Sequence, residues 1–127
     1  MPFEFVIDVP GNVIREKWSG TITLEELYDS CRQELAHPDF SKGMHLLSDF
    51  REAQSEFNHE ELMEFAQYMA QTLPTLRHAV IVSRRVGFGV ARMFGSMIEA
   101  SSASPSPHRV FFDADEAEQW LIPPRTR

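Results

Sequence analysis

The sequence predicts an α/β domain built on a mixed, mostly parallel five-stranded sheet that begins with an antiparallel hairpin and is packed with helices. Two observations predict this class. Short apolar segments alternate with amphipathic helical segments along most of the chain, in the order β-β-α-β-α-β-α-β-α. The first two strand-like segments are separated only by Pro10, Gly11 and Asn12, which is too short for a parallel crossover. A chain of 127 residues suits one domain over residues 1–127.

The N-terminal hairpin is predicted from period-two patterns. In residues 3–9, Phe3, Phe5 and Ile7 alternate with other residues, and a second strand follows over residues 13–19. Two assignments of the inward face of this second strand are open. One face carries Ile14, Glu16 and Trp18, and the other carries Val13, Arg15 and Lys17. The large apolar ring of Trp18 favours the first set.

Two capping boxes mark the starts of the next two helices. Thr23 is followed three residues later by Glu26, and Asn58 by Glu61. Each cap precedes an apolar stripe at helical spacing: Leu24, Leu27, Tyr28, Cys31 and Leu35 in the first helix, and Leu62, Phe65, Ala66, Met69 and Leu73 in the second. Pro38 and Pro74 lie just beyond the two stripes and end the helices. Between them, residues 44–50 are predicted to form a buried strand.

The C-terminal part continues the alternation. Residues 79–83 form a nearly continuous apolar run, which is typical of a strand covered on both faces. A third helix is predicted over residues 88–102, followed by a loop rich in Ser and Pro over residues 101–107. A last strand spans residues 109–112. Asp113 caps a final helix, which ends near Leu121 because two prolines follow.

Composition and charge exclude several classes of function. The net charge is −7, from 12 basic and 19 acidic residues, so nucleic acid is a poor partner. The single Cys31 excludes an internal disulfide, and its place in an apolar helical stripe indicates a small core residue. No apolar run approaches the roughly 20 residues of a transmembrane helix. The N-terminus lacks the pattern of a signal peptide, so we expect a cytoplasmic protein.

Three segments carry a resemblance to a known family. They are the opening hairpin, residues 77–83 with the following residues 87–94, and residues 110–121, where a strand, an acidic cap and a short helix end in Trp120 and Leu121. Together they resemble the SpoIIAA-like family of the STAS domain superfamily, from about residue 6 to residue 121. The resemblance implies this fold and no established activity.

The best-known members of that superfamily antagonise anti-sigma factors and are switched by phosphorylation of a serine in an Asp-Ser-Ser-Gly-like motif. The motif lies at the start of the helix after the central strand. The same region here contains no such motif; the helix start offers Asn58, His59 and Glu60, and the nearest hydroxyl belongs to Ser55. We therefore expect a module without this switch. Other branches of the superfamily bind lipids or other apolar small molecules, or are cytosolic parts of anion transporters.

Two loops are predicted at the carboxyl ends of the parallel strands, where open α/β sheets bind ligands. The first follows the strand that ends near Phe50 and involves Asp49 and Arg51; Asp49 could form a carboxylate pair with Glu52 or an ion pair with Arg51. The second follows Ser83 and contains Arg84, Arg85, Gly87, Phe88 and Gly89. Two arginines and two glycines before a helix start could cradle an anion. The alternative interpretation is a tight turn with solvated arginines.

The predicted third helix has a broad apolar surface that includes Phe88, Met93 and Met97. Core packing explains such a surface, and so does contact with a partner, a second subunit or an apolar ligand. The two candidate regions can also act together. Arg84 and Arg85 would then bind a charged head group while Phe88, Met93 and Met97 hold an apolar tail.

The sequence does not determine the function, and it favours a non-catalytic regulatory or binding module. The partner would be a protein or a small anionic or amphipathic ligand, and we expect a homodimer. No cofactor or metal is predicted, because the five histidines are scattered without metal-ligand spacing. The alternative is a small enzyme of unknown reaction with its site at the carboxyl ends of the strands. It requires a pocket in which Asp49 or a histidine reaches a reactive group.

Overall fold

The computed structural model describes residues 3–55, 57–73, 75–83 and 107–122. They form one five-stranded sheet in the spatial order β1-β2-β3-β4-β5. The strands are β1 (Phe3–Asp8), β2 (Val13–Ile22), β3 (His45–Ser55), β4 (His78–Ile81) and β5 (His108–Phe111). β1 pairs with β2 antiparallel, and the other three pairings are parallel. The predicted mixed sheet with an opening hairpin is confirmed.

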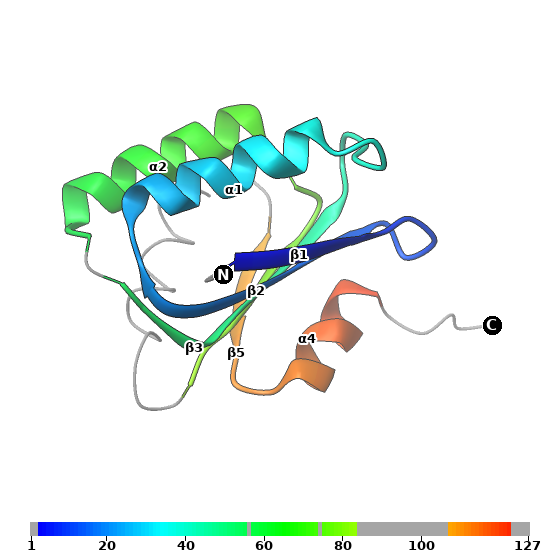
Figure 1. Cartoon of the computed structure of the whole chain (residues 1–127). Coiled ribbons are helices and arrows are strands. Elements are labelled where there is room, and N and C mark those ends of the chain that lie inside the picture. Colours follow the sequence, from blue (N-terminus) through cyan, green and yellow to red (C-terminus); the bar gives the residue numbers. More distant parts are fainter. Residues whose placement is uncertain (1–2, 56, 74, 84–106, 123–127) are drawn as a thin grey trace.

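Helices cover both faces of this sheet (Figure 1). α1 (Leu24–Ala36) and α2 (His59–Thr72) contact each other over one face, and α4 (Ala114–Leu121) packs on the other against β3, β4 and β5. The helix predicted over residues 88–102 lies outside the described residues. Within the described ranges, no helix has the length and apolar character needed to cross a membrane.

The predicted helix caps are confirmed. The backbone N–H of Glu26 donates to Thr23 Oγ1 at 3.2 Å, and Glu26 Oε1 accepts from the backbone N–H of Thr23 at 2.8 Å. Asn58 and Glu61 make the same reciprocal pair, at 2.9 Å in both directions. The carboxylate of Asp113 accepts from two backbone amides of the first turn of α4. Each cap satisfies amides that the first helical turn leaves without a partner.

Two strands are longer than predicted. β2 continues to Ile22 instead of ending at residue 19, and β3 continues to Ser55 instead of ending at residue 50. Their register shifts between Lys17 and Ser19, where a bulge inserts an extra residue into β3, and pairing then resumes as far as Ile22 and Ser55. The physical reason is that backbone pairing with β2 holds this polar end of β3 extended, although its side chains resemble those of a loop.

The two faces of the sheet bury alternate residues of the same strands. Ile14, Trp18 and Leu46 pack beneath α1 and α2, together with the alternating Phe3, Phe5 and Ile7 of β1. The inward set of β2 that Trp18 favoured is therefore confirmed. The other face is also covered, because Val13 is buried beneath α4 in a cluster with Leu47, Ala79, Ile81, Phe111, Ala117 and Leu121.

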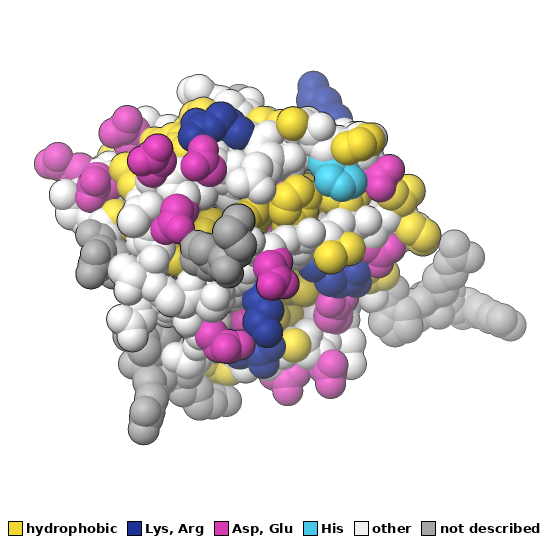
Figure 2. Space-filling view, viewed as in Figure 1, with side chains coloured by type: hydrophobic (Ala, Val, Ile, Leu, Met, Phe, Trp, Pro, Cys, Tyr) yellow, Lys and Arg dark blue, Asp and Glu magenta, His cyan; other side chains and the backbone are white. Residues whose placement is uncertain are grey.

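Basic side chains on the surface lie among acidic ones, as Figure 2 shows for one face. Arg15 contacts both Asp8 and Glu118, at 2.7 and 2.8 Å, and Lys17 pairs with Glu52 at 3.4 Å. This arrangement compensates basic charge locally. The four basic side chains of such ion pairs, Arg15, Lys17, Arg32 and Arg51, are therefore not gathered into a patch of uncompensated positive charge.

Candidate functional site

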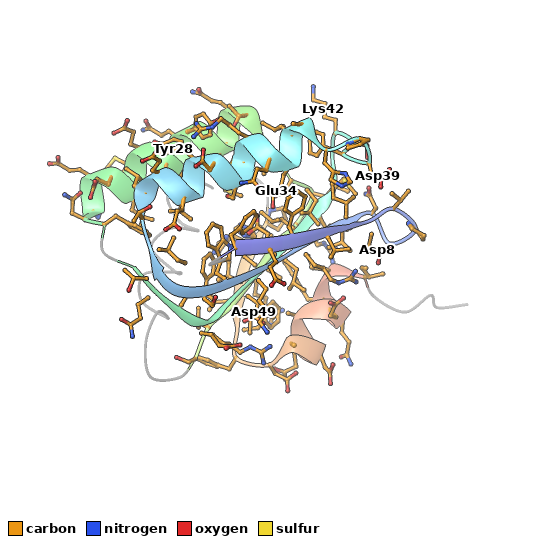
Figure 3. The ribbon with its side chains drawn as sticks, in the orientation of Figure 1. Asp8, Tyr28, Glu34, Asp39, Lys42 and Asp49 are labelled. Carbon is orange, nitrogen blue, oxygen red and sulfur yellow. The ribbon has the colours of Figure 1, made fainter. Side chains whose placement is uncertain are left out.

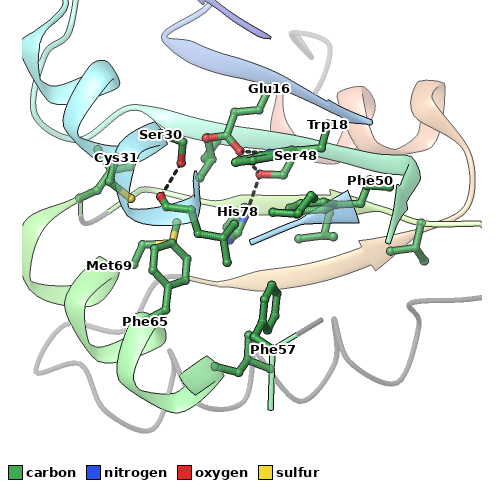
Figure 4. Close-up of a pocket in the computed structure, with 18 of the residues that line it drawn as sticks. Glu16, Trp18, Ser30, Cys31, Ser48, Phe50, Phe57, Phe65, Met69 and His78 are labelled. Atoms are coloured by element: carbon green, nitrogen blue, oxygen red, sulfur yellow. Dashed lines mark hydrogen bonds between the residues drawn. The ribbon is translucent and has the colours of Figure 1, made fainter. Parts of the chain in front are cut away.

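A cavity of about 120 Å³ lies between the sheet and helices α1 and α2 (Figure 4). Its walls come from β2, β3, β4, both helices and the segment before α2. The described residues that line it are mainly apolar: Trp18, Ile22, Leu27, Cys31, Leu46, Phe50, Ala53, Phe57, Leu62, Phe65, Met69, Leu73, Val80 and Val82. The polar ones are Glu16, Ser30, Ser48, Gln54 and His78. Such an apolar cavity with a few convergent polar groups is typical of small-molecule sites.

Small side chains leave the space that this cavity occupies. On the helix side, Ser30 and Cys31 face the sheet from α1. On the sheet side, Ser48 and Ala53 stand among the larger residues of β3. Protein interiors are otherwise close-packed, so several small residues opposite one another leave a void. The void therefore follows from residue size at particular positions of a regular fold.

Three polar side chains from adjacent strands meet at the sheet side of the cavity. Ser48 Oγ lies 2.7 Å from Glu16 Oε1 and 3.1 Å from His78 Nε2. The indole N–H of Trp18 donates to the same Glu16 oxygen at 3.2 Å. The parallel register places these residues together. Ser48 pairs with Glu16 of β2 and with Val80 of β4, and His78 lies two residues before Val80 on the same face of β4. All three are buried.

The hydrogen atoms in the two hydrogen bonds of Ser48 can be assigned. A serine hydroxyl has one hydrogen, and Ser48 donates it to the Glu16 carboxylate. His78 must then donate to Ser48 through Nε2, which fixes the tautomer of the ring. Burial lowers the pKa of His78 well below its usual range, and the neighbouring His108 lowers it further. His78 is therefore neutral at physiological pH.

A fourth polar group, Glu34, lies between α1 and the sheet (Figure 3). Its side chain is fully buried, and neither carboxyl oxygen accepts a hydrogen bond from the described residues. Burial raises the pKa of Glu34 far above its usual range, and the charge and contact of Glu16 raise it further. Glu34 therefore keeps its proton at neutral pH.

Cys31 lines the same cavity from α1. It is a free, buried thiol, as its position in the apolar stripe predicted. Burial raises the pKa of this thiol strongly, and the nearby Glu16 and Glu34 add to the effect. The thiol is therefore protonated at neutral pH and is a poor nucleophile. Among the described residues, no group of three or more His, Cys, Asp or Glu side chains could hold a metal ion.

The structure places Asp49 and Arg51 away from this cavity. Both lie within β3 and not in a loop after it, because the strand continues to Ser55. Asp49 alternates with Ser48 and Phe50, which line the cavity, so it faces the opposite side of the sheet. Arg51 Nη2 lies 2.7 Å from Asp49 Oδ2. Burial alone would raise the pKa of the Asp49 carboxyl, but the hydrogen bonds from Arg51 outweigh burial, so this pKa is lowered.

The rest of the predicted anion and amphipathic site lies outside the described residues. These residues are Arg84, Arg85, Gly87, Phe88, Gly89, Met93 and Met97. The carboxylate pair considered for Asp49 and Glu52 is replaced by two separate ion pairs, since Glu52 contacts Lys17 and Asp49 contacts Arg51.

Sequence reasoning did not identify the buried polar side chains beside the cavity, which are Glu16, Glu34, Ser48 and His78. The positions of two of them, however, carry a signal in the sequence. Glu16 stands between Ile14 and Trp18 on the inward face of its strand, and Glu34 lies three residues after Cys31 on the inward side of α1. A carboxylate on an apolar face is a candidate functional group. Ser48 and His78 carry no comparable signal, because only the strand register brings them together.

Comparisons with known proteins support the fold. No protein-family model matches this chain, and neither does any curated protein. A crystal structure of an uncharacterized protein from Shewanella loihica PV-4, of the DUF3478 family and with a SpoIIAA-like fold, is similar to it. The TM-score is 0.64 and the identity 17%, over 94% of this chain and 93% of that one. The likeness confirms the predicted SpoIIAA-like fold and, at this identity, shows the fold alone.

Proposed function

We propose that this protein is a non-catalytic binding or regulatory module that holds a small, largely apolar molecule between the sheet and helices α1 and α2. The observation that carries the proposal is the cavity of about 120 Å³ with apolar walls and a buried polar chain on one side. Apolar walls supply affinity, and a few fixed polar groups orient the ligand.

The volume supports a compact ligand. An engineered apolar cavity of about 150 Å³ accepts benzene, so a cavity of this size suits a single ring or a short branched chain. Gln54 lines the cavity and its side chain is exposed, so we infer that a longer ligand would extend toward solvent beside this residue.

The charge of the cavity narrows the ligand classes that the sequence suggested. An anionic head group would lie beside the Glu16 carboxylate in an apolar environment, where like charges repel strongly. We therefore propose that this cavity takes an amphipathic ligand whose head group is not anionic. An anion site formed by Arg84 and Arg85, which lie outside the described residues, is a separate proposal.

A titration with benzyl alcohol tests the proposal. We expect amide chemical shift changes in NMR spectra to cluster at cavity residues such as Ser48, Leu62 and Phe65, and to saturate at millimolar concentration. The variant Ala53→Leu fills part of the cavity and should abolish the effect. Val6→Leu enlarges a side chain at an exposed site outside the cavity and should leave it unchanged. Shift changes spread over the surface, or binding that survives Ala53→Leu, would reject the site.

The contact between Ser48 and His78 favours an enzyme as the second candidate. It meets the requirement for a histidine within hydrogen-bond reach of a hydroxyl in a cavity. The Ser48 proton, however, is directed to Glu16, and His78 occupies its Nε2 with a hydrogen. Ester hydrolysis measured with 4-nitrophenyl acetate separates the two candidates. A rate equal for the wild type and Ser48→Ala supports the binding module, and a rate that falls at least about tenfold in the variant supports the enzyme.

A homodimer or another protein partner belongs to the same proposal. β1 forms one edge of the sheet, and Val6 and Val9 near that edge are 66% and 56% exposed. An edge strand can add the strand of a second chain. Light scattering at high protein concentration tests this; a monomer throughout would exclude the dimer.

A further inference from the structure

We propose that the ligand is a small organic cation, an amine whose apolar part fills the cavity and whose ammonium group lies against Glu16. This inference rests on the proposed binding function and names the chemical class of its ligand. Three observations carry it: an uncompensated buried charge, a free acceptor position on that charge, and aromatic walls around it.

The first observation is the charge. Glu16 is only 7% exposed, and two donors, the indole N–H of Trp18 and the hydroxyl of Ser48, are directed at its carboxylate. Four described basic residues have acidic partners elsewhere: Arg15 with Asp8 and Glu118, Lys17 with Glu52, Arg32 with Asp29, and Arg51 with Asp49. No basic side chain in the described part of the chain forms an ion pair with Glu16. A buried charge without a counterion is costly, and a bound cation would compensate it.

The second observation is the hydrogen-bond capacity of Glu16. A carboxylate offers about four acceptor positions on its two oxygens. Trp18 and Ser48 fill two of them, both on Oε1. Glu16 lines the cavity, so its remaining acceptor positions are available to a donor within it. An ammonium group supplies both that donor and the missing positive charge.

The third observation is the aromatic lining. Trp18, Phe50, Phe57 and Phe65 contribute to the walls, and Figure 4 shows Phe57 and Phe65 across the cavity from the polar chain. Aromatic rings attract cations through their quadrupole, and the attraction strengthens where water is excluded. A neutral ligand would use the same apolar surface, but it would leave the charge of Glu16 unbalanced.

Three probes of similar size and different charge test the inference. We expect benzylamine, which is protonated at neutral pH, to bind at least about tenfold more tightly than benzyl alcohol, and benzoate to bind most weakly. Isothermal titration calorimetry or NMR titration of the full chain gives the three affinities. A wild type that does not prefer benzylamine to benzyl alcohol rejects the inference before any variant is made.

Two matched substitutions locate the effect. Glu16→Gln removes the charge with little change of shape, and it should bring the affinity for benzylamine to about the level of benzyl alcohol. Glu34→Gln imitates the protonated carboxyl, so benzylamine should bind within about threefold of the wild type. Circular dichroism and the dispersion of amide signals check that both variants are folded.

The outcomes separate the two proposals. Equal affinity for benzylamine and benzyl alcohol would overturn the cation inference and leave the binding function standing. A preference for benzylamine that persists in a folded Glu16→Gln variant would also overturn it, because the charge would lie elsewhere. If none of the three probes binds, both proposals fail.

Discussion

The two faces of the sheet use the same strands in different ways. Beneath α4, Val13, Ala79, Ala117 and Leu121 are almost completely buried, and the charged Arg15 is paired with two carboxylates at the edge of that layer. Beneath α1 and α2, the next residues along the strands leave a cavity, and Glu16 is buried without a cation among the described residues. The α4 face is therefore closely packed. The face beneath α1 and α2 contains a cavity and a buried carboxylate without a counterion among the residues described, which is typical of binding sites.

Truncation of a buried leucine gives the largest expected difference between the faces. Leu121→Ala removes a side chain from the packed α4 layer and should lower the free energy of unfolding by about 3–5 kcal/mol, because it creates a new void. Leu62→Ala only enlarges the existing cavity, so it should cost about 2–3 kcal/mol. Urea denaturation measures both. Equal losses would mean that the cavity is closed in solution.

Replacement of a small side chain by a larger one tests the same difference between the two faces. Ala117→Leu overfills the α4 layer, where Ala117 is 0% exposed, and should destabilise by about 1–3 kcal/mol. Ala53→Leu extends into the cavity and should change stability by less than about 0.5 kcal/mol. Thermal unfolding provides the comparison. A large loss in Ala53→Leu would contradict the presence of free space beside β3.

The pH dependence of the free energy of unfolding tests whether Glu34 is protonated in the folded protein. In the unfolded chain this carboxyl ionises above about its ordinary pKa of 4.5, whereas in the folded protein it keeps its proton. The folded state then binds more protons, so stability falls as pH rises. His78 acts with the opposite sign, but only below about its ordinary pKa of 6.5, because there the unfolded state binds the extra proton.

Between pH 7 and pH 8, the wild type should therefore lose up to about 1.4 kcal/mol of stability. Glu34→Gln should remove this loss, and the control Glu64→Gln, at an exposed site on α2, should retain it. Urea unfolding at the two pH values gives the slopes. A slope in Glu34→Gln equal to that of the wild type would mean that Glu34 is ionised in the folded protein.

The smallest effect is expected at the ion pairs of the α4 face. Arg15→Ala removes the contacts with Asp8 and Glu118, but all three side chains are about one third exposed. We expect a loss of no more than about 1 kcal/mol, decreasing with added salt. A loss above about 2 kcal/mol would show that charge compensation on this face is as important as packing.

The fold was largely predictable because its signals are local. The caps at Thr23 and Asn58, the alternation of Phe3, Phe5 and Ile7, and the short turn at Gly11 each act within a few residues. The end of β3 was not predictable, because pairing with β2 beyond the bulge keeps its polar residues extended. The site was harder still. Glu16, Ser48 and His78 are about 30 residues apart from one to the next, and only register joins them.

A crystal structure of the protein soaked in benzylamine tests the central claim most directly. We predict electron density for the aromatic ring inside the cavity beneath α1 and α2, with the ammonium nitrogen about 3 Å from an oxygen of Glu16. An empty cavity at a saturating concentration of the amine, or an amine bound only outside it, would contradict the account.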